Sequence, residues 1–112
     1  MKEFLFLFRR DFKTREKQPT PEEFKAHLDH WQEWLGRLSE QGILTKAPQR
    51  WDGQGRVVSQ GKSIINGPYA EIKESIGGMI IIKADDYETA EKIAMDCPIL
   101  ELNGTVEIRM AL

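Results

Sequence analysis

Two histidines, His27 and His30, are the side chains of this sequence best suited to acid–base chemistry. Both fall on a segment whose apolar residues recur at helical spacing. At about 100° per residue, His27 lies beside the apolar stripe and His30 lies further toward solvent. A histidine at the margin of a buried face can have a shifted pKa and act as a general base. His27 is therefore the candidate catalytic residue, although a hydrogen-bonded boundary histidine with a structural role is the commoner situation.

A metal site is not predicted. His27 and His30 are three positions apart, so both rings could reach one ion, but no third ligand follows at a recognisable spacing. Asp29 points away from His27. The single cysteine, Cys97, allows neither an intramolecular disulfide nor a cysteine-rich metal motif. We therefore expect no metal and no other cofactor.

A loop between Asn66 and Gly78 holds the second group of candidate residues. Gly67-Pro68 fixes a turn, and Gly77-Gly78 lets the backbone approach another segment closely. Binding residues tend to lie on such constrained loops. The candidate ligand-binding side chains here are Asn66, Tyr69, Glu71 and Lys73. The alternative is a solvated connection in which Tyr69 only plugs the end of a barrel.

Arg9 and Trp31 are the remaining candidate ligand-binding residues. Arg9 follows an apolar strand and could hold an anionic group. Trp31, together with Tyr69, could line an apolar cleft near His27. These side chains fit an enzyme acting on a small organic molecule, such as a cofactor-independent lyase or isomerase with His27 as base. They equally fit a domain that binds a small molecule or a regulatory partner without catalysis.

A helix over residues 20–42 is the clearest predicted element. Thr20 fits the N-cap, Pro21 the first helical position and Glu23 the third, which completes a capping box. Gly42 is placed to end the helix in the left-handed conformation. The predicted buried stripe consists of Phe24, Leu28, Trp31, Leu35 and Leu38.

The remaining segments read as strands and a second helix. Residues 4–8 and 78–83 are apolar at nearly every position, whereas residues 105–110 alternate. Residues 43–45 can begin another strand, and residues 56–58 and 63–65 form a predicted hairpin. Asp85 or Asp86 caps the second helix, and Pro98 stops it. The inner face of that helix is predicted to be Tyr87, Ala90, Ile93, Ala94 and Cys97.

This order predicts a single α+β domain over residues 1–112, with the split βαβ pattern of a ferredoxin-like fold and an antiparallel sheet. Two helices can cover only one face of the sheet, yet strands 4–8 and 78–83 are apolar on both. The simplest resolution is a homodimer in which two sheets pack together as a dimeric α/β barrel. The alternative is that long loops cover the second face within one chain.

Charge and hydropathy exclude several classes of partner. The formal net charge is −2, so the basic surface typical of nucleic-acid-binding domains is not expected. No apolar run approaches the roughly 20 residues of a membrane span. The apolar start of the chain is too short for a signal peptide core and lacks a small-residue cleavage site. We therefore expect a cytoplasmic protein that binds neither nucleic acid nor membrane.

The loop after Asn66 resembles the signature of the YCII-related family, in its DGPF-type branch. That signature reads Asp-Gly-Pro-Phe-x-Glu-x-Lys-Glu followed by Gly-Gly. The matching residues here are Gly67, Pro68, Glu71, Lys73, Glu74, Gly77 and Gly78. The segments Cys97-Pro98 and 104–109 are similar to the closing part of the family pattern. With the N-terminal strand and helix, the resemblance covers essentially the whole chain.

The resemblance implies a ferredoxin-like dimeric barrel with a cleft between sheet and helices, and His27 looks similar to the family's helix histidine. It also suggests a setting in transcription regulation, because DGPF-type relatives often occur beside extracytoplasmic-function sigma factors. Two positions depart from the pattern. Asn66 replaces the usual Asp, and an amide cannot act as an acid or base near neutral pH. The family often has Asp-Pro near the end of the second helix, where this chain has Cys97-Pro98, with Asp96 one residue earlier. A His–Asp pair proposed for some relatives is therefore incomplete in this chain.

Overall fold

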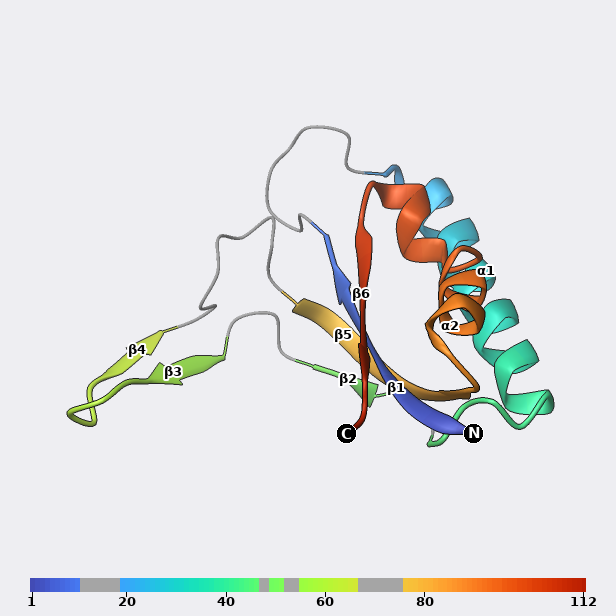
Figure 1. The fold of residues 1–112 in the computed structure, drawn as a ribbon. Coiled ribbons are helices and arrows are strands. Elements are labelled where there is room, and N and C mark those ends of the chain that lie inside the picture. The colour runs from blue at the N-terminus through green and yellow to red at the C-terminus, as the bar shows by residue number, and fades with distance from the viewer. Residues whose placement is uncertain (11–18, 47–48, 52–54, 67–75) are drawn as a thin grey trace.

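The chain folds into two layers, with helices packed on one face of a four-stranded antiparallel sheet (Figure 1). The computed structural model describes residues 1–10, 19–46, 49–51, 55–66 and 76–112. In spatial order the sheet strands are β2 (Gln49–Arg50), β5 (Ile76–Ala84), β1 (Lys2–Arg9) and β6 (Thr105–Met110). The helices are α1 (Pro21–Glu40), α2 (Tyr87–Ala94) and the short 3-10 helix η2 (Pro98–Leu102). A separate hairpin consists of β3 (Arg56–Val58) and β4 (Ile64–Asn66).

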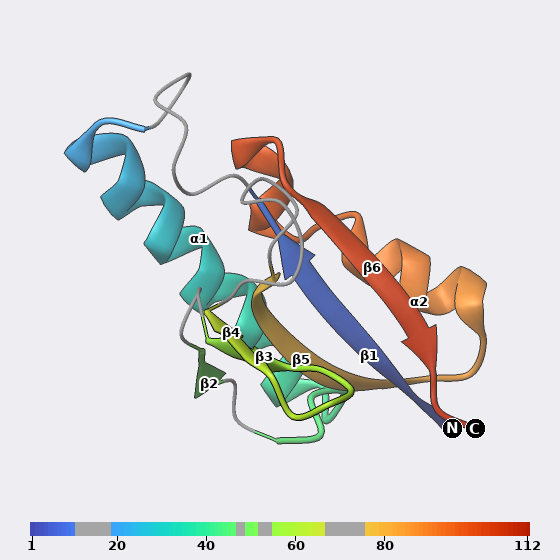
Figure 2. The same cartoon turned by 90° about the vertical axis from the view of Figure 1, so that its left-hand side faces the viewer.

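The predicted ferredoxin-like α+β fold is confirmed. The units β1-α1-β2 and β5-α2-β6 each leave a gap between their two strands, and a strand of the other unit fills it. Figure 2 shows both helices running behind the sheet, with the β3–β4 hairpin in front of it. The hairpin is thus an excursion between the second and third strands of the fold.

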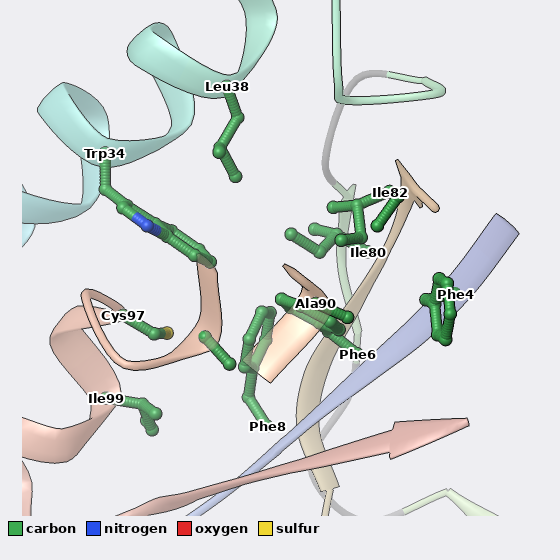
Figure 3. Packing of buried hydrophobic residues seen from close by; sticks show 12 residues of the cluster. Phe4, Phe6, Phe8, Trp34, Leu38, Ile80, Ile82, Ala90, Cys97 and Ile99 are labelled. Atoms are coloured by element: carbon green, nitrogen blue, oxygen red, sulfur yellow. The ribbon is translucent and has the colours of Figure 1, made fainter. Parts of the chain in front are cut away.

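The two apolar faces of β1 have different surroundings. Phe4, Phe6 and Phe8 point toward the helices, where they join a buried cluster with residues of β5, α1 and α2 (Figure 3). Leu5 and Leu7 point to the opposite side of the sheet, which we call the open face because neither helix lies on it. The register places Leu5 opposite Ile81 and Leu7 opposite Met79, so the open face has an apolar centre.

Helix α1 begins as predicted, because Thr20 and Glu23 form both hydrogen bonds of a capping box. Gly42, with φ of 71°, follows the end of the helix in the left-handed conformation, also as predicted. The buried face, however, is rotated from the predicted stripe: His27, Trp34 and Leu38 are its buried residues. Phe24 and Leu28 remain 40% and 46% exposed. The prediction missed this rotation because the large apolar side chains span about a third of the helix circumference, and their spacing does not say which part of that arc packs on the sheet.

Helix α2 is shorter than predicted. Asp86 is its N-cap, and its side chain accepts hydrogen bonds from the backbone N–H and the hydroxyl of Thr89. The helix ends at Ala94, so Cys97 lies beyond it, and Pro98 begins η2 instead of only stopping a helix. Proline suits a first helical position because its fixed φ is helical and its missing N–H is not needed there. Tyr87 faces inward as predicted, because its ring makes an edge-to-face contact with the buried Phe4 at 5.1 Å. The residue is still 43% exposed, and its hydroxyl accepts a hydrogen bond from the Met110 N–H.

The second predicted strand begins with a single bridge instead of a ladder. Leu44 bridges to Ile82, and Thr45 N–H donates to the Ile81 carbonyl. The ladder itself forms at β2, opposite Met79 and Gly78 of β5.

Within the described residues, no helix is long and apolar enough to cross a membrane.

Candidate functional site

His27 lies in the helix-facing half of the molecule with only 4% of its surface exposed. It is on the same side of α1 as Trp31, one turn later, because residues four apart in a helix are neighbours. The indole N–H of Trp31 donates to Nε2 of His27 at 2.8 Å. His27 is therefore a buried polar residue that has already found a partner within its own helix.

A second partner comes from η2, far away in sequence. One carboxylate oxygen of Glu101 lies 3.1 Å from Nδ1 of His27, and the other lies 2.8 Å from Nδ1 of His30. Pro98 begins the tight turn of η2, and this turn aims Glu101 at α1. The carboxylate thus bridges two histidines on successive turns of one helix.

These contacts fix the protonation pattern of the His27 ring. An indole nitrogen can only donate, so Nε2 of His27 must accept and carries no hydrogen. The proton then sits on Nδ1 and is donated to Glu101. In this state His27 is neutral, and the lone pair that a general base uses is occupied by Trp31.

Glu101 keeps its negative charge at this position. Burial acts to raise the pKa of Glu101, but the hydrogen bonds from His27 and His30 outweigh it, so the pKa lies below its usual value of 4.5. The Glu101 side chain is 45% exposed, so water also solvates the carboxylate and screens its interactions. A charged carboxylate is the stronger acceptor, which supports the tautomer assigned to His27.

Aromatic rings pack around the histidine. The His27 ring lies 6.2 Å from the rings of both Phe24 and Trp31. Trp31 makes edge-to-face contacts with Phe8 at 5.0 Å and with Trp34 at 5.7 Å. Such contacts contribute about 0.5–1.5 kcal/mol beyond simple burial. Trp31 is thus held in place by packing as well as by its hydrogen bond to His27.

Among the predicted site residues that the structure describes, His27 and Trp31 lie together. Arg9 lies on the open face, on the other side of the sheet, where it forms an ion pair with Glu107 at 3.0 Å. The hydrogen bond from Arg109, followed by the charges of Arg109 and Arg9, lowers the pKa of Glu107 against the effect of burial. Asn66 ends β4, in the hairpin. The other predicted ligand-binding residues, Tyr69, Glu71 and Lys73, lie outside the described residues.

Sequence reasoning missed Glu101, the residue that completes this cluster. The sequence suggested Asp96 as the nearest replacement for a family carboxylate, but Asp96 is exposed, and the carboxylate that reaches His27 belongs to Glu101. The available signal was Pro98 at the start of a short helical turn, with an acidic residue three positions later. That signal gives the turn but not its contact with a helix 70 residues earlier.

His27, His30 and Glu101 do not form a metal centre in this arrangement. Trp31 occupies one nitrogen of His27, and the two oxygens of Glu101 each bind a different histidine. Across the part of the chain that the structure describes, no group of three or more His, Cys, Asp or Glu side chains could hold a metal ion.

Comparison with known proteins gives a family match over nearly the whole chain. The family model described as YCII-related domain matches residues 7–111. A search of curated proteins finds no significant match. Among solved structures, 5-chloro-2-hydroxyhydroquinone dehydrochlorinase from Burkholderia phenoliruptrix AC1100, in complex with 2,5-dihydroxybenzoquinone, aligns with a TM-score of 0.49 and 14% identity. The alignment covers 98% of this chain and 93% of that one.

Proposed function

The chain belongs to the YCII-related domain family, and we propose that it is a homodimeric member that binds a small molecule, or serves a regulatory role, without catalysing a reaction. We include in this proposal a cytoplasmic location and the DGPF-type branch, which the sequence around Gly67-Pro68 supports. A partner in transcription regulation would fit the same role.

The hydrogen bond from Trp31 to His27 is the observation that carries the proposal. A general base must present a free lone pair to the proton that it removes. In His27 that lone pair accepts the Trp31 N–H at 2.8 Å, and the ring is only 4% exposed. Catalysis by His27 would require Trp31 to move away from it. The ring contacts of Trp31 with Phe8 and Trp34 stabilise its present position and oppose that movement.

The surroundings of His27 favour an aromatic or carboxylate ligand. Phe24 and Leu28 expose apolar surface on α1 next to the half-buried Trp31. A flat apolar compound would bury this surface, gaining roughly 25 cal/mol for each Å² removed from water. A carboxylate on the same compound could accept a hydrogen bond from the exposed His30.

A homodimer is supported by the open face of the sheet. Leu5, Leu7, Met79 and Ile81 form its apolar centre, and both helices lie on the other side. Leu7 is already buried within the single chain, whereas Leu5, Met79 and Ile81 are half-buried. Sheets that pack face to face bury such surfaces. A second copy that offers the same face would satisfy two-fold symmetry.

A ligand screen followed by a test for turnover examines this proposal. We would screen small aromatic and carboxylate compounds by thermal shift, with the parent protein and His30→Ala, and with Asp29→Ala as the control on the same helix. A compound at 100 times its dissociation constant stabilises the native state by roughly 2.7 kcal/mol, which raises Tm by several degrees. Proton NMR of each hit after prolonged incubation should show the compound unchanged. Consumption of a bound compound would overturn the non-catalytic role.

The alternative function is a cofactor-independent lyase or isomerase on a small aromatic or carboxylate substrate. One observation favours it: Glu101 fixes the tautomer of His27 and would stabilise the imidazolium that forms when a base takes a proton. Trp31→Phe keeps an aromatic ring at this position but removes the indole N–H that occupies Nε2 of His27. An enzyme should retain or gain turnover in Trp31→Phe and lose it in His27→Gln. A binding domain should show no turnover in either variant.

A further inference from the structure

The β3–β4 hairpin, which we call the arm (residues 56–66), is apolar on both of its faces. Val58 pairs with Ile64 on one face, and Val57 pairs with Ile65 on the other. Val58, Ile64 and Ile65 are 67%, 64% and 56% exposed. The arm strands pair with each other and with no other strand in the described part of the chain. The arm therefore exposes, in a single chain, side chains of the kind that normally form a core.

A two-stranded hairpin of this kind needs a surface to pack against. Isolated hairpins are at best marginally stable in water, and a third strand or a packed layer is usually required. Val and Ile favour strands because they fit a pleated, half-buried surface. The arm has the residues for such packing, and no other helix or strand of the described residues packs closely on it.

The position of the arm indicates which surface could cover it. In Figure 1 the arm extends to the side of the sheet away from the helices, and in Figure 2 it lies in front of the open face. A second copy that packs on the open face would therefore lie alongside the arm. Two-fold symmetry would place the partner's arm against the first copy in the same way.

The total surface of the chain is large enough for this arrangement. The single chain exposes 8377 Å², whereas compact monomers of its mass expose about 6,300 Å². Its radius of gyration is 15.3 Å, against about 13 Å for a compact domain of this length. The excess of about 2,000 Å² is more than the roughly 800 Å² that each partner buries in a standard interface.

Charge complementarity also favours a second copy. The arm, residues 56–66, contains two basic side chains, Arg56 and Lys62, and no acidic one. The helical segments 20–40 and 85–103 together carry eleven Asp or Glu and only three Lys or Arg. All eleven carboxylate residues are exposed. An arm that reaches past the partner's sheet toward its helices would thus meet charge of the opposite sign.

We infer that the arm packs against a second copy of this chain, with its apolar side chains in contact with the partner subunit. Arg56 and Lys62 then point toward the acidic helical segments of the partner. This inference rests on the homodimer of the proposed function and adds the element that holds it together. Each copy would give one arm and receive one. The interface would then join the sheet faces at its centre and the two arms at its sides.

Sedimentation velocity across a concentration series tests the arm, with Ile64→Lys and Ile65→Lys placing a charge on each of its faces. Met95→Lys is the matched control, because Met95 is equally exposed but follows α2 on the helical side. Circular dichroism and thermal melting would verify that each variant is folded. We expect the parent and the control to be dimers, and the dimer dissociation constant to rise about 30-fold or more in each arm variant.

The outcomes separate the arm from the homodimer itself. Folded arm variants that become monomers while the control stays dimeric would support the arm. Dimers that persist unchanged in both arm variants would overturn it and leave the homodimer standing. A parent protein that remains monomeric at every concentration would overturn both proposals.

Discussion

At the scale of single residues, Glu101 joins parts of the chain that are far apart in sequence. Its two oxygens bind His27, 74 positions away, and His30, 71 positions away. Removing one partner of such a cluster leaves the other groups without a hydrogen bond, which costs more than the bond itself contributes. The partial exposure of Glu101 moderates that cost because water can replace a lost partner.

Glu101→Gln should destabilise the protein at neutral pH by roughly 0.2–1 kcal/mol, the range for exposed charged pairs. The folded-state pKa of Glu101 is lowered, so its contribution is present above 4.5, the usual value, and is lost as the pH falls through the folded pKa. The difference in Tm between parent and variant should therefore shrink between pH 6 and pH 3, a window of about three units. Glu91→Gln, exposed on α2, serves as the control and should show no comparable trend. A constant difference across the series would contradict the role assigned to the Glu101 charge.

Cys97 should not react with iodoacetamide in the folded protein. Burial, and to a smaller extent the charge of Glu101, raise the pKa of this thiol to about 12 against a weaker hydrogen bond involving Ile99. Only the thiolate is an effective nucleophile, and little of it forms at pH 8. Mass spectrometry should find the alkylated product only after unfolding in guanidinium chloride. Alkylation of the native protein at the rate of a free thiol would show that this region opens readily.

At the scale of secondary-structure elements, local chemistry predicted boundaries better than orientation. The capping box at Thr20 and the left-handed Gly42 depend on neighbouring residues, and both predictions were correct. The buried face of α1 depends on how the helix packs against β1 and β5, which a helical period alone does not specify. The turn after Pro98 likewise depends on a local rule, but the contact of Glu101 with α1 depends on tertiary packing.

Gly104, between η2 and β6, should tolerate no side chain. A methyl group there would lie 2.7 Å from the Arg9 carbonyl oxygen, 2.8 Å from that of Ile99 and 2.5 Å from the Ile99 side chain. Backbone atoms cannot move aside easily, so Gly104→Ala should cost about 1–3 kcal/mol in unfolding free energy. Gly36→Ala, in the middle of α1 with open space around it, should instead stabilise by roughly 0.5–1 kcal/mol. Urea denaturation would measure both, and equal effects would refute this reading of Gly104.

At the scale of the whole molecule, acidic and basic residues are separated between layers. The helical segments are strongly acidic, whereas the arm is basic. The overall charge of −2 conceals this separation, because the helical segments sum to −8, the arm to +2 and the remaining residues to +4. The dimer remains a prediction from strands that are apolar on both faces. The sequence could suggest it through β1 and β5, but it could not show that the hairpin extends from the open face.

Charge reversal on the arm should weaken the dimer in a salt-dependent way. Arg56→Glu combined with Lys62→Glu should raise the dissociation constant of the dimer about tenfold at low ionic strength. The increase should be smaller at roughly 0.5 M salt, because charges more than about 4–5 Å apart are then screened. Lys25→Glu combined with Lys92→Glu changes the net charge equally but lies in the acidic helical layer. Sedimentation velocity would compare the two pairs. Equal weakening would point to net charge as the cause, not to the arm.

The bond between Trp31 and His27 gives the protein an optical readout of its own. Indole emission depends on the partner of the ring N–H. Any compound that separates the two rings should therefore alter the fluorescence of Trp31. Of the other two tryptophans, Trp34 is buried and Trp51 is half exposed, so the two should emit at different wavelengths. The protein can therefore report on its candidate site without a label.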